Sequence, residues 1–166
     1  MEPSRTDVTA AVCAAVFIAV LAVSAYWDRS IRVLHVFESL PYLLAAVLCL
    51  RRNKFGYALG LASGAFWLWT AGFLTTFIRN GFERVEMLLR AGSVDRPDIL
   101  IAVPAAVATA GLALSSVLGY ARLPNKSWHD AAVLAAAIVM VAAFFVAIFA
   151  AFAPQYLQMF RGLITS

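Results

Sequence analysis

A histidine and a glutamate lie three residues apart in an apolar stretch of this chain of 166 residues. His35 and Glu38 share one helix face, because residues three apart are neighbours on a helix surface. An acid at the centre of a membrane span costs about 2.5–3.5 kcal/mol, so it needs a partner or a role. The pair is either a proton, ion or headgroup site, or an ion pair that fixes helix packing, and we favour the second interpretation.

Three charged residues of a later polar segment could join this pair. Glu83 and Glu86 repeat the three-residue spacing, and Arg79 precedes them. If the chain crosses a membrane five times, this segment lies on the same side as Glu38, so these residues could approach His35. Carboxylate–histidine pairs hold metals in helical bundles. That chemistry needs more ligands than the sequence offers, so we predict no metal and no cofactor.

Composition places the chain among membrane proteins. It is 63% hydrophobic and 13% charged, whereas soluble domains are roughly 45–50% apolar and about 25% charged. The net charge of +4 comes from short loops between apolar runs. This distribution is typical of a polytopic protein that contacts anionic lipid headgroups, and we expect no nucleic-acid partner.

Five apolar runs are long enough to cross a bilayer, which takes about 20 residues. We therefore predict an all-α fold, a single integral membrane domain comprising residues 1–166 and built as a helical bundle. The expected transmembrane helices cover about 8–26, 33–50, 56–78, 99–121 and 131–153.

A short amphipathic helix is expected between the third and fourth spans, at about 81–91. Phe82, Val85 and Leu89 recur at helical spacing, while most charged residues fall on other faces. Such a helix lies in the membrane interface.

Small residues recur every four positions in the third and fourth spans. This spacing lets helices approach closely, so we predict helix packing at these positions. The partner helix could belong to the same chain or to another copy, and we expect a homo-oligomer or a complex with other membrane subunits. The packing residues are Gly56, Gly60, Gly64, Gly111, Ser115 and Gly119.

Two tryptophans, Trp67 and Trp69, sit near the middle of the third span. Tryptophans in membrane proteins prefer the interfaces, so their position is unusual. They could contact a lipid or a hydrophobic ligand, but filling the space beside the glycines is the interpretation we favour.

The basic turn that holds Arg51, Arg52 and Lys54 indicates the orientation, because short cytoplasmic loops are enriched in Lys and Arg. We expect the N-terminus in the cytoplasm and the C-terminus outside. The Ala- and Arg-rich composition indicates a bacterial protein of the inner (cytoplasmic) membrane.

Three functions follow from these residues. The first is a non-enzymatic subunit that packs into an oligomer or larger membrane complex. The second is a small proton- or cation-coupled transporter or channel that uses Glu38 and His35. The third is a lipid-active enzyme with a His/carboxylate site at the outer face. We prefer a non-enzymatic role, because the sequence has no phosphate-binding loop, HExxH or GxSxG motif.

Overall fold

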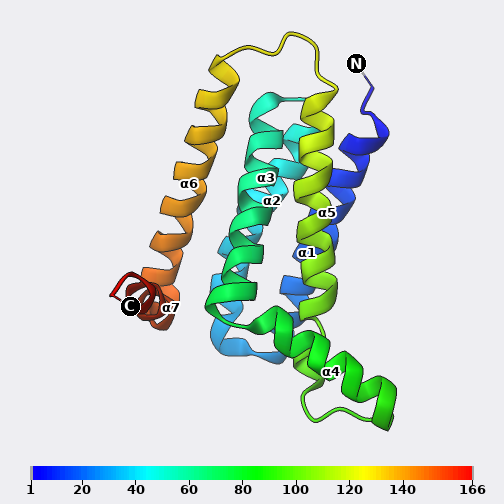
Figure 1. The fold of residues 1–166 in the computed structure, drawn as a ribbon, viewed down its shortest axis with the longest axis vertical. Helices are drawn as coiled ribbons and strands as arrows, with labels where there is room; N and C mark the ends of the chain where they lie inside the picture. The colour runs from blue at the N-terminus through cyan, green and yellow to red at the C-terminus, as the bar shows by residue number, and fades with distance from the viewer. Residues whose placement is uncertain (1, 166) are drawn as a thin grey trace.

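The computed structural model describes residues 2–165, with side chains for residues 2–159. No strand occurs in this part of the chain, which folds into helices joined by short turns (Figure 1). The long helices are α1 (Arg5–Trp27), α2 (Arg32–Leu50), α3 (Lys54–Trp69), α5 (Ala102–Ala121) and α6 (His129–Phe152). The shorter ones are η1 (Arg29–Ile31), η2 (Thr70–Leu74), α4 (Phe77–Ala91), η3 (Pro97–Ile99) and α7 (Pro154–Thr165).

Five of the described helices are long and apolar enough to cross a membrane. The candidate spans have 21 to 25 residues and mean hydropathies from 1.2 to 2.9, where α2, α3 and α5 are counted together with η1, η2 and η3. The prediction of an all-helical bundle with five such helices is confirmed.

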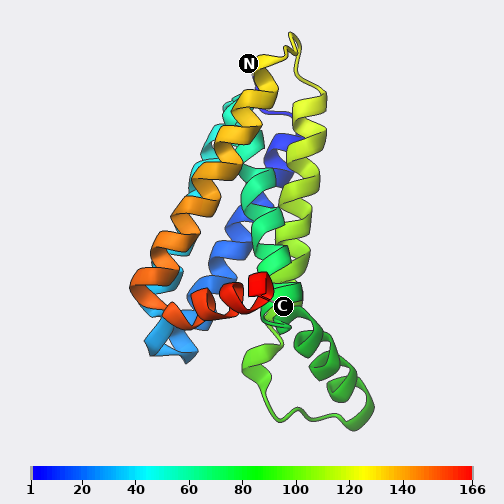
Figure 2. The ribbon, with the colours of Figure 1, turned by 60° about the vertical axis from the view of Figure 1, so that its left-hand side comes forward.

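Four helices form the body of the bundle and α6 leans against it. α1 packs on α2 and α5, while α3 packs on α2, α5 and α6. The N-terminus and the end of α6 lie at opposite ends of the bundle (Figure 1). At the lower end α4 projects obliquely away from the bundle, and α7 runs crosswise from the end of α6 (Figure 2).

The third span ends differently from the sequence prediction. α3 continues as the π-helix η2 only to Leu74, and Thr76 then adopts a left-handed conformation with φ of 54°. The Thr75 hydroxyl donates to the Thr70 carbonyl at 3.3 Å and accepts from the Phe77 amide at 3.4 Å. Threonine hydroxyls compete in this way with the helical hydrogen bonds. Phe77 therefore begins α4, four residues before the predicted start of the amphipathic helix.

The glycines of the packing motifs face other helices of the same chain. A methyl group on Gly64 would lie 2.7 Å from the Thr109 carbonyl oxygen of α5, and one on Gly119 would lie 2.5 Å from the Tyr57 ring of α3. Gly60 also faces α5. Their counterparts Gly56 and Gly111 face α2 and α1, and Ser115 is buried. The close approach that the sequence predicts is therefore made within one chain.

We predict that Gly64→Ala destabilises the protein. The added methyl group meets backbone, which cannot rotate away, and overpacking of this kind costs about 1–3 kcal/mol. Thermal unfolding in detergent should show a lower midpoint. Gly72→Ala is the matched control, because the nearest atom to its added methyl group, Ile78 Cδ1, is 3.8 Å away. Equal midpoints for the two variants would contradict close packing at Gly64.

Candidate functional site

His35 and Glu38 form a buried polar pair on α2. His35 Nδ1 lies 2.6 Å from Glu38 Oε2, and His35 Nε2 lies 3.0 Å from the Ser24 hydroxyl of α1. Glu38 is only 6% exposed. When the ring is neutral and Nδ1 donates to the carboxylate, Nε2 accepts the Ser24 hydroxyl proton. The imidazole thus connects a serine to a carboxylate and can carry a proton between them.

A cavity of about 230 Å³ opens beside this pair, in the lower half of the bundle. Glu38 reaches its wall, and Glu38 Oε1 makes no hydrogen bond to any described residue. The remaining wall is mostly apolar. Its Phe, Trp and Tyr members are Phe17, Phe66, Trp67, Phe77, Phe145, Phe149 and Tyr156.

Aromatic contacts fix the shape of this cavity. The Phe17 ring meets the Trp67 ring edge-on with centroids 5.1 Å apart, and the Phe66 and Phe145 rings stack at 4.6 Å. These contacts join α1 to α3 and α3 to α6. The cavity is therefore bounded by rigid side chains from several helices, which is typical of a ligand site.

The break between α3 and α4 adds polar groups to the same cavity. Thr70, Thr75 and Asn80 line it, and the π-helix η2 places Thr70 on the wall. Single π-turns inside helices are frequent at functional sites. No spacing rule in the sequence connects these residues to His35, because they come from a different part of the chain.

Tyr156 of α7 closes the lower side of the cavity. Burial raises the pKa of its hydroxyl, and the nearby Glu38 carboxylate raises that pKa further. The phenol therefore stays protonated at neutral pH and can donate a hydrogen bond. Ser24 and Tyr156 are site residues that the sequence did not single out, because only the folded chain brings their helices to the same cavity.

The charged residues predicted to approach His35 lie elsewhere. Arg79 pairs with Glu83 at 3.0 Å, and Arg90 pairs with Glu86 at 2.5 Å, all on exposed faces of α4. Such i,i+4 pairs stabilise a helix by themselves. None of these residues lines the cavity, which α4 reaches through Phe77 and Asn80 among its described residues.

The two tryptophans lie on different faces of α3, because residues two positions apart do not face each other on a helix. Trp67 lies on the cavity wall, whereas Trp69 is 41% exposed on another face, with its ring 6.4 Å from that of Phe66. Trp67 is therefore the tryptophan placed to contact a molecule in the cavity.

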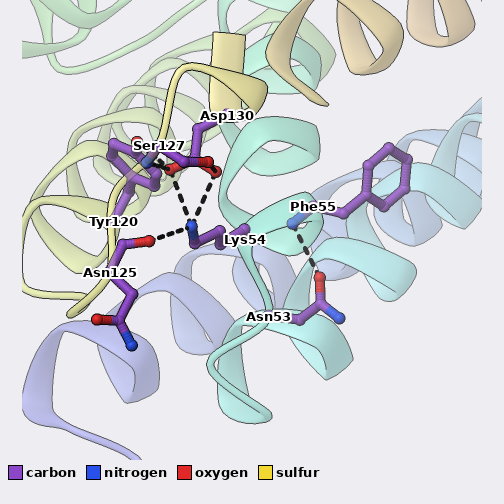
Figure 3. Close-up of polar contacts among 7 residues, drawn as sticks. All are labelled: Asn53, Lys54, Phe55, Tyr120, Asn125, Ser127 and Asp130. Carbon is purple, nitrogen blue, oxygen red and sulfur yellow. Dashed lines mark hydrogen bonds and ion pairs between the residues drawn. The ribbon is translucent and has the colours of Figure 1, made fainter. Parts of the chain in front are cut away.

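A second polar cluster joins α6 to the rest of the bundle at the end away from His35 (Figure 3). Lys54 Nζ donates to both carboxylate oxygens of Asp130, at 2.8 and 2.9 Å, and to the Asn125 carbonyl at 2.7 Å. The Tyr120 hydroxyl and the Ser127 amide also donate to Asp130, at 2.8 and 3.0 Å. This cluster, the Lys54–Asp130 clasp, joins the first turns of α3 and α6 to the end of α5.

A third acid, Asp7 of α1, is buried at the same end and 1% exposed. It accepts the Tyr57 hydroxyl proton at 2.6 Å and caps its own helix through the Ser4 amide at 2.7 Å. Arg52 lies 3.8 Å away. These contacts pair the carboxylate fully, so its role is to hold α1 against α3.

Among the described residues, no group of three or more His, Cys, Asp or Glu side chains comes together to hold a metal ion. No protein-family model, curated protein or solved structure matches this chain. The function must therefore be inferred from the geometry of the site itself.

We expect Asp130→Asn to loosen α6. The amide cannot accept all the hydrogen bonds that the carboxylate accepts, and it leaves the Lys54 charge without its counter-ion. The thermal midpoint should fall by several degrees, and protease should cut the loop at 122–128 faster. Glu83→Gln removes an equally charged residue from the exposed face of α4 and serves as control. Unchanged stability and cleavage in Asp130→Asn would show that the clasp does not hold α6.

Proposed function

We propose that this chain is an integral membrane protein that crosses the bilayer five times. Large apolar side chains cover the outer faces of its long helices. Contact of so much apolar surface with water would be unfavourable. Val36 is 58% exposed, Val107 67% and Val139 67%. Lipid tails cover such faces at no cost, which supports the membrane location.

In this arrangement α4 lies in the interface. Leu89 is 81% exposed and Phe82 55%, while Arg79 and Arg90 pair with Glu83 and Glu86 of the same helix. An exposed apolar face beside a charged one suits the boundary between headgroups and tails. A cytoplasmic N-terminus and a bacterial inner-membrane location remain part of the proposal.

Membrane topology tests this directly. Five spans place the termini on opposite sides, so a reporter at residue 1 should be active in the cytoplasm and one at residue 166 outside it. The chain should also stay in the membrane during extraction at alkaline pH. Release into the alkaline supernatant, or reporters on the same side, would contradict the five-span insertion.

We further propose that the protein binds a small organic cation at the cavity, as a cation-coupled transporter would. One observation carries this: the buried Glu38 lines a cavity walled by aromatic rings and has one oxygen without a hydrogen-bond partner among the described residues. Aromatic cages attract quaternary ammonium groups through the faces of their rings. The carboxylate supplies the opposite charge, and the apolar walls accommodate the hydrocarbon part of the ligand.

His35 holds Glu38 while the cavity is empty. The hydrogen bond between His35 Nδ1 and Glu38 Oε2 reduces the cost of burying the carboxylate, and an arriving cation adds an opposite charge from the side of the cavity. The Ser24 hydroxyl bonds the other ring nitrogen of His35 and so fixes the orientation of the imidazole.

The structure supports this function more specifically than the other two. The glycine faces that suggested an oligomer are filled by helices of the same chain. The acids of α4, which a lipid-active enzyme would use, pair with arginines away from His35. Assembly with other membrane subunits remains a prediction, and no surface described above favours a particular partner.

Glu38→Gln should weaken the binding of benzyltrimethylammonium by about tenfold or more, which is about 1.4 kcal/mol. Titration calorimetry of the protein in detergent measures this. The variant keeps the size and a hydrogen-bonding oxygen but loses the charge. Glu83→Gln is the matched control and should bind like the unmodified protein. Equal affinities for all three proteins would refute a cation site at Glu38.

A further inference from the structure

A second hollow of about 420 Å³ lies between α5 and α6, at the opposite end from His35. These two helices are joined by the loop at 122–128 but scarcely touch along their length, since each packs on α3 instead. Their separation is visible in Figure 1. The α3 residues Ala58 and Leu61 form the floor of the resulting groove, and its walls include Val117 of α5 and Leu134 of α6.

This α5–α6 groove is apolar along its length and polar at one mouth. The Lys54–Asp130 clasp lines the mouth, together with Tyr120 and Ser127. Lys54 directs its three ammonium protons to Asp130 and Asn125, so its charge is balanced there. The clasp therefore fixes the width of the groove rather than supplying free charge.

The free positive charge at the mouth comes from Lys126. Its side chain is exposed, donates to the Ala121 carbonyl at 2.7 Å and places Nζ 5.9 Å from the centre of the Tyr120 ring. Arg122 is exposed in the same loop. This end of the bundle as a whole is basic: Arg5, Arg51, Arg52, Lys54, Arg122 and Lys126 outnumber Glu2, Asp7 and Asp130.

Trp128 sets the depth of the mouth in the membrane. It is 78% exposed and stands beside the His129 ring, with centroids 3.8 Å apart, in the loop that joins α5 to α6. Exposed tryptophans of membrane proteins lie at headgroup level. The mouth then faces the headgroups, while the groove runs down into the hydrocarbon.

We propose that one anionic phospholipid occupies the α5–α6 groove. Its phosphate binds Lys126 at the mouth, and one acyl chain lies along α3 between Val117 and Leu134. Basic sites between transmembrane helices on the cytoplasmic side commonly bind anionic headgroups. A second copy of the chain in parallel orientation is disfavoured, because it would bring the same basic end to the mouth. This proposal rests on the membrane insertion proposed above, but not on the cation site.

Native mass spectrometry of the full chain in detergent, titrated with phosphatidylglycerol or phosphatidylcholine, tests the proposal. We expect one tightly bound phosphatidylglycerol, with an apparent affinity about fivefold or more above that for phosphatidylcholine. Lys126→Gln should remove the preference, whereas Arg79→Gln, which removes a charge at the other end, should keep it. Ala131→Phe fills the groove and should abolish tight binding of both lipids. Val139→Phe adds the same ring to a face of α6 that is 67% exposed and should leave binding intact.

Three results would overturn the proposal: equal affinity for the two lipids, lipid binding by Ala131→Phe equal to that by Val139→Phe, or a dimer in place of the lipid adduct. An unchanged thermal midpoint and an unchanged circular dichroism spectrum show that each variant is folded. A chain that resists alkaline extraction and binds the cation, yet shows no lipid preference, refutes the lipid site alone. A chain that alkaline pH extracts refutes the lipid site and the membrane proposal together.

Discussion

The close approach of α3 and α5 is the contact on which the rest of the structure depends. Gly60 and Gly64 bring the two backbones together on one side, and Gly119 admits the Tyr57 ring on the other. Beyond Gly64 the small residues of α3 give way to Phe66 and Trp67. Large rings hold the helices apart there, and that is where the cavity begins. The two backbones are therefore closest beside the glycines, and the cavity beside Glu38 opens where the large rings begin.

The same contact determines how the buried acids are paired. Tyr57 reaches Asp7 because it packs against Gly119, and Asp130 is balanced by Lys54 where α6 meets α3. Both of these acids have permanent partners. Glu38 differs from them, because His35 bonds only one of its oxygens among the described residues and because Glu38 also lines the cavity. Such a carboxylate can bind a ligand in addition to its partner in the chain, whereas a fully paired carboxylate can only hold helices together.

Local periodicity accounts for what the sequence could predict. The helical fold, the five long apolar helices and the shared face of His35 and Glu38 all follow from the spacing of residues within one helix. The end of the third apolar helix could not be predicted from this spacing, because the π-turn depends on which groups the Thr75 hydroxyl bonds. Nor could the sequence indicate that Arg79 would pair with Glu83 on α4.

The other residues of the site come together only in the tertiary structure. Ser24, Asn80 and Tyr156 reach the cavity from three different helices, and no spacing in the chain relates them. For the glycine motifs, the sequence left open which helix they would meet, because a small residue is compatible with any close partner. Only the fold shows that the partners are α1, α2, α3 and α5 of the same molecule.

Because α6 is held at both ends, this helix connects the two hollows mechanically. Its 24 residues form a rod about 36 Å long, held by Asp130 at one end and by the stacked rings of Phe145 and Phe66 toward the other. Lys54 and Phe66, the partners at the two ends, both belong to α3. The two hollows share no residue, yet both lie against α3 and α6, so a displacement of α6 relative to α3 changes the α5–α6 groove and the cavity beside Glu38 together.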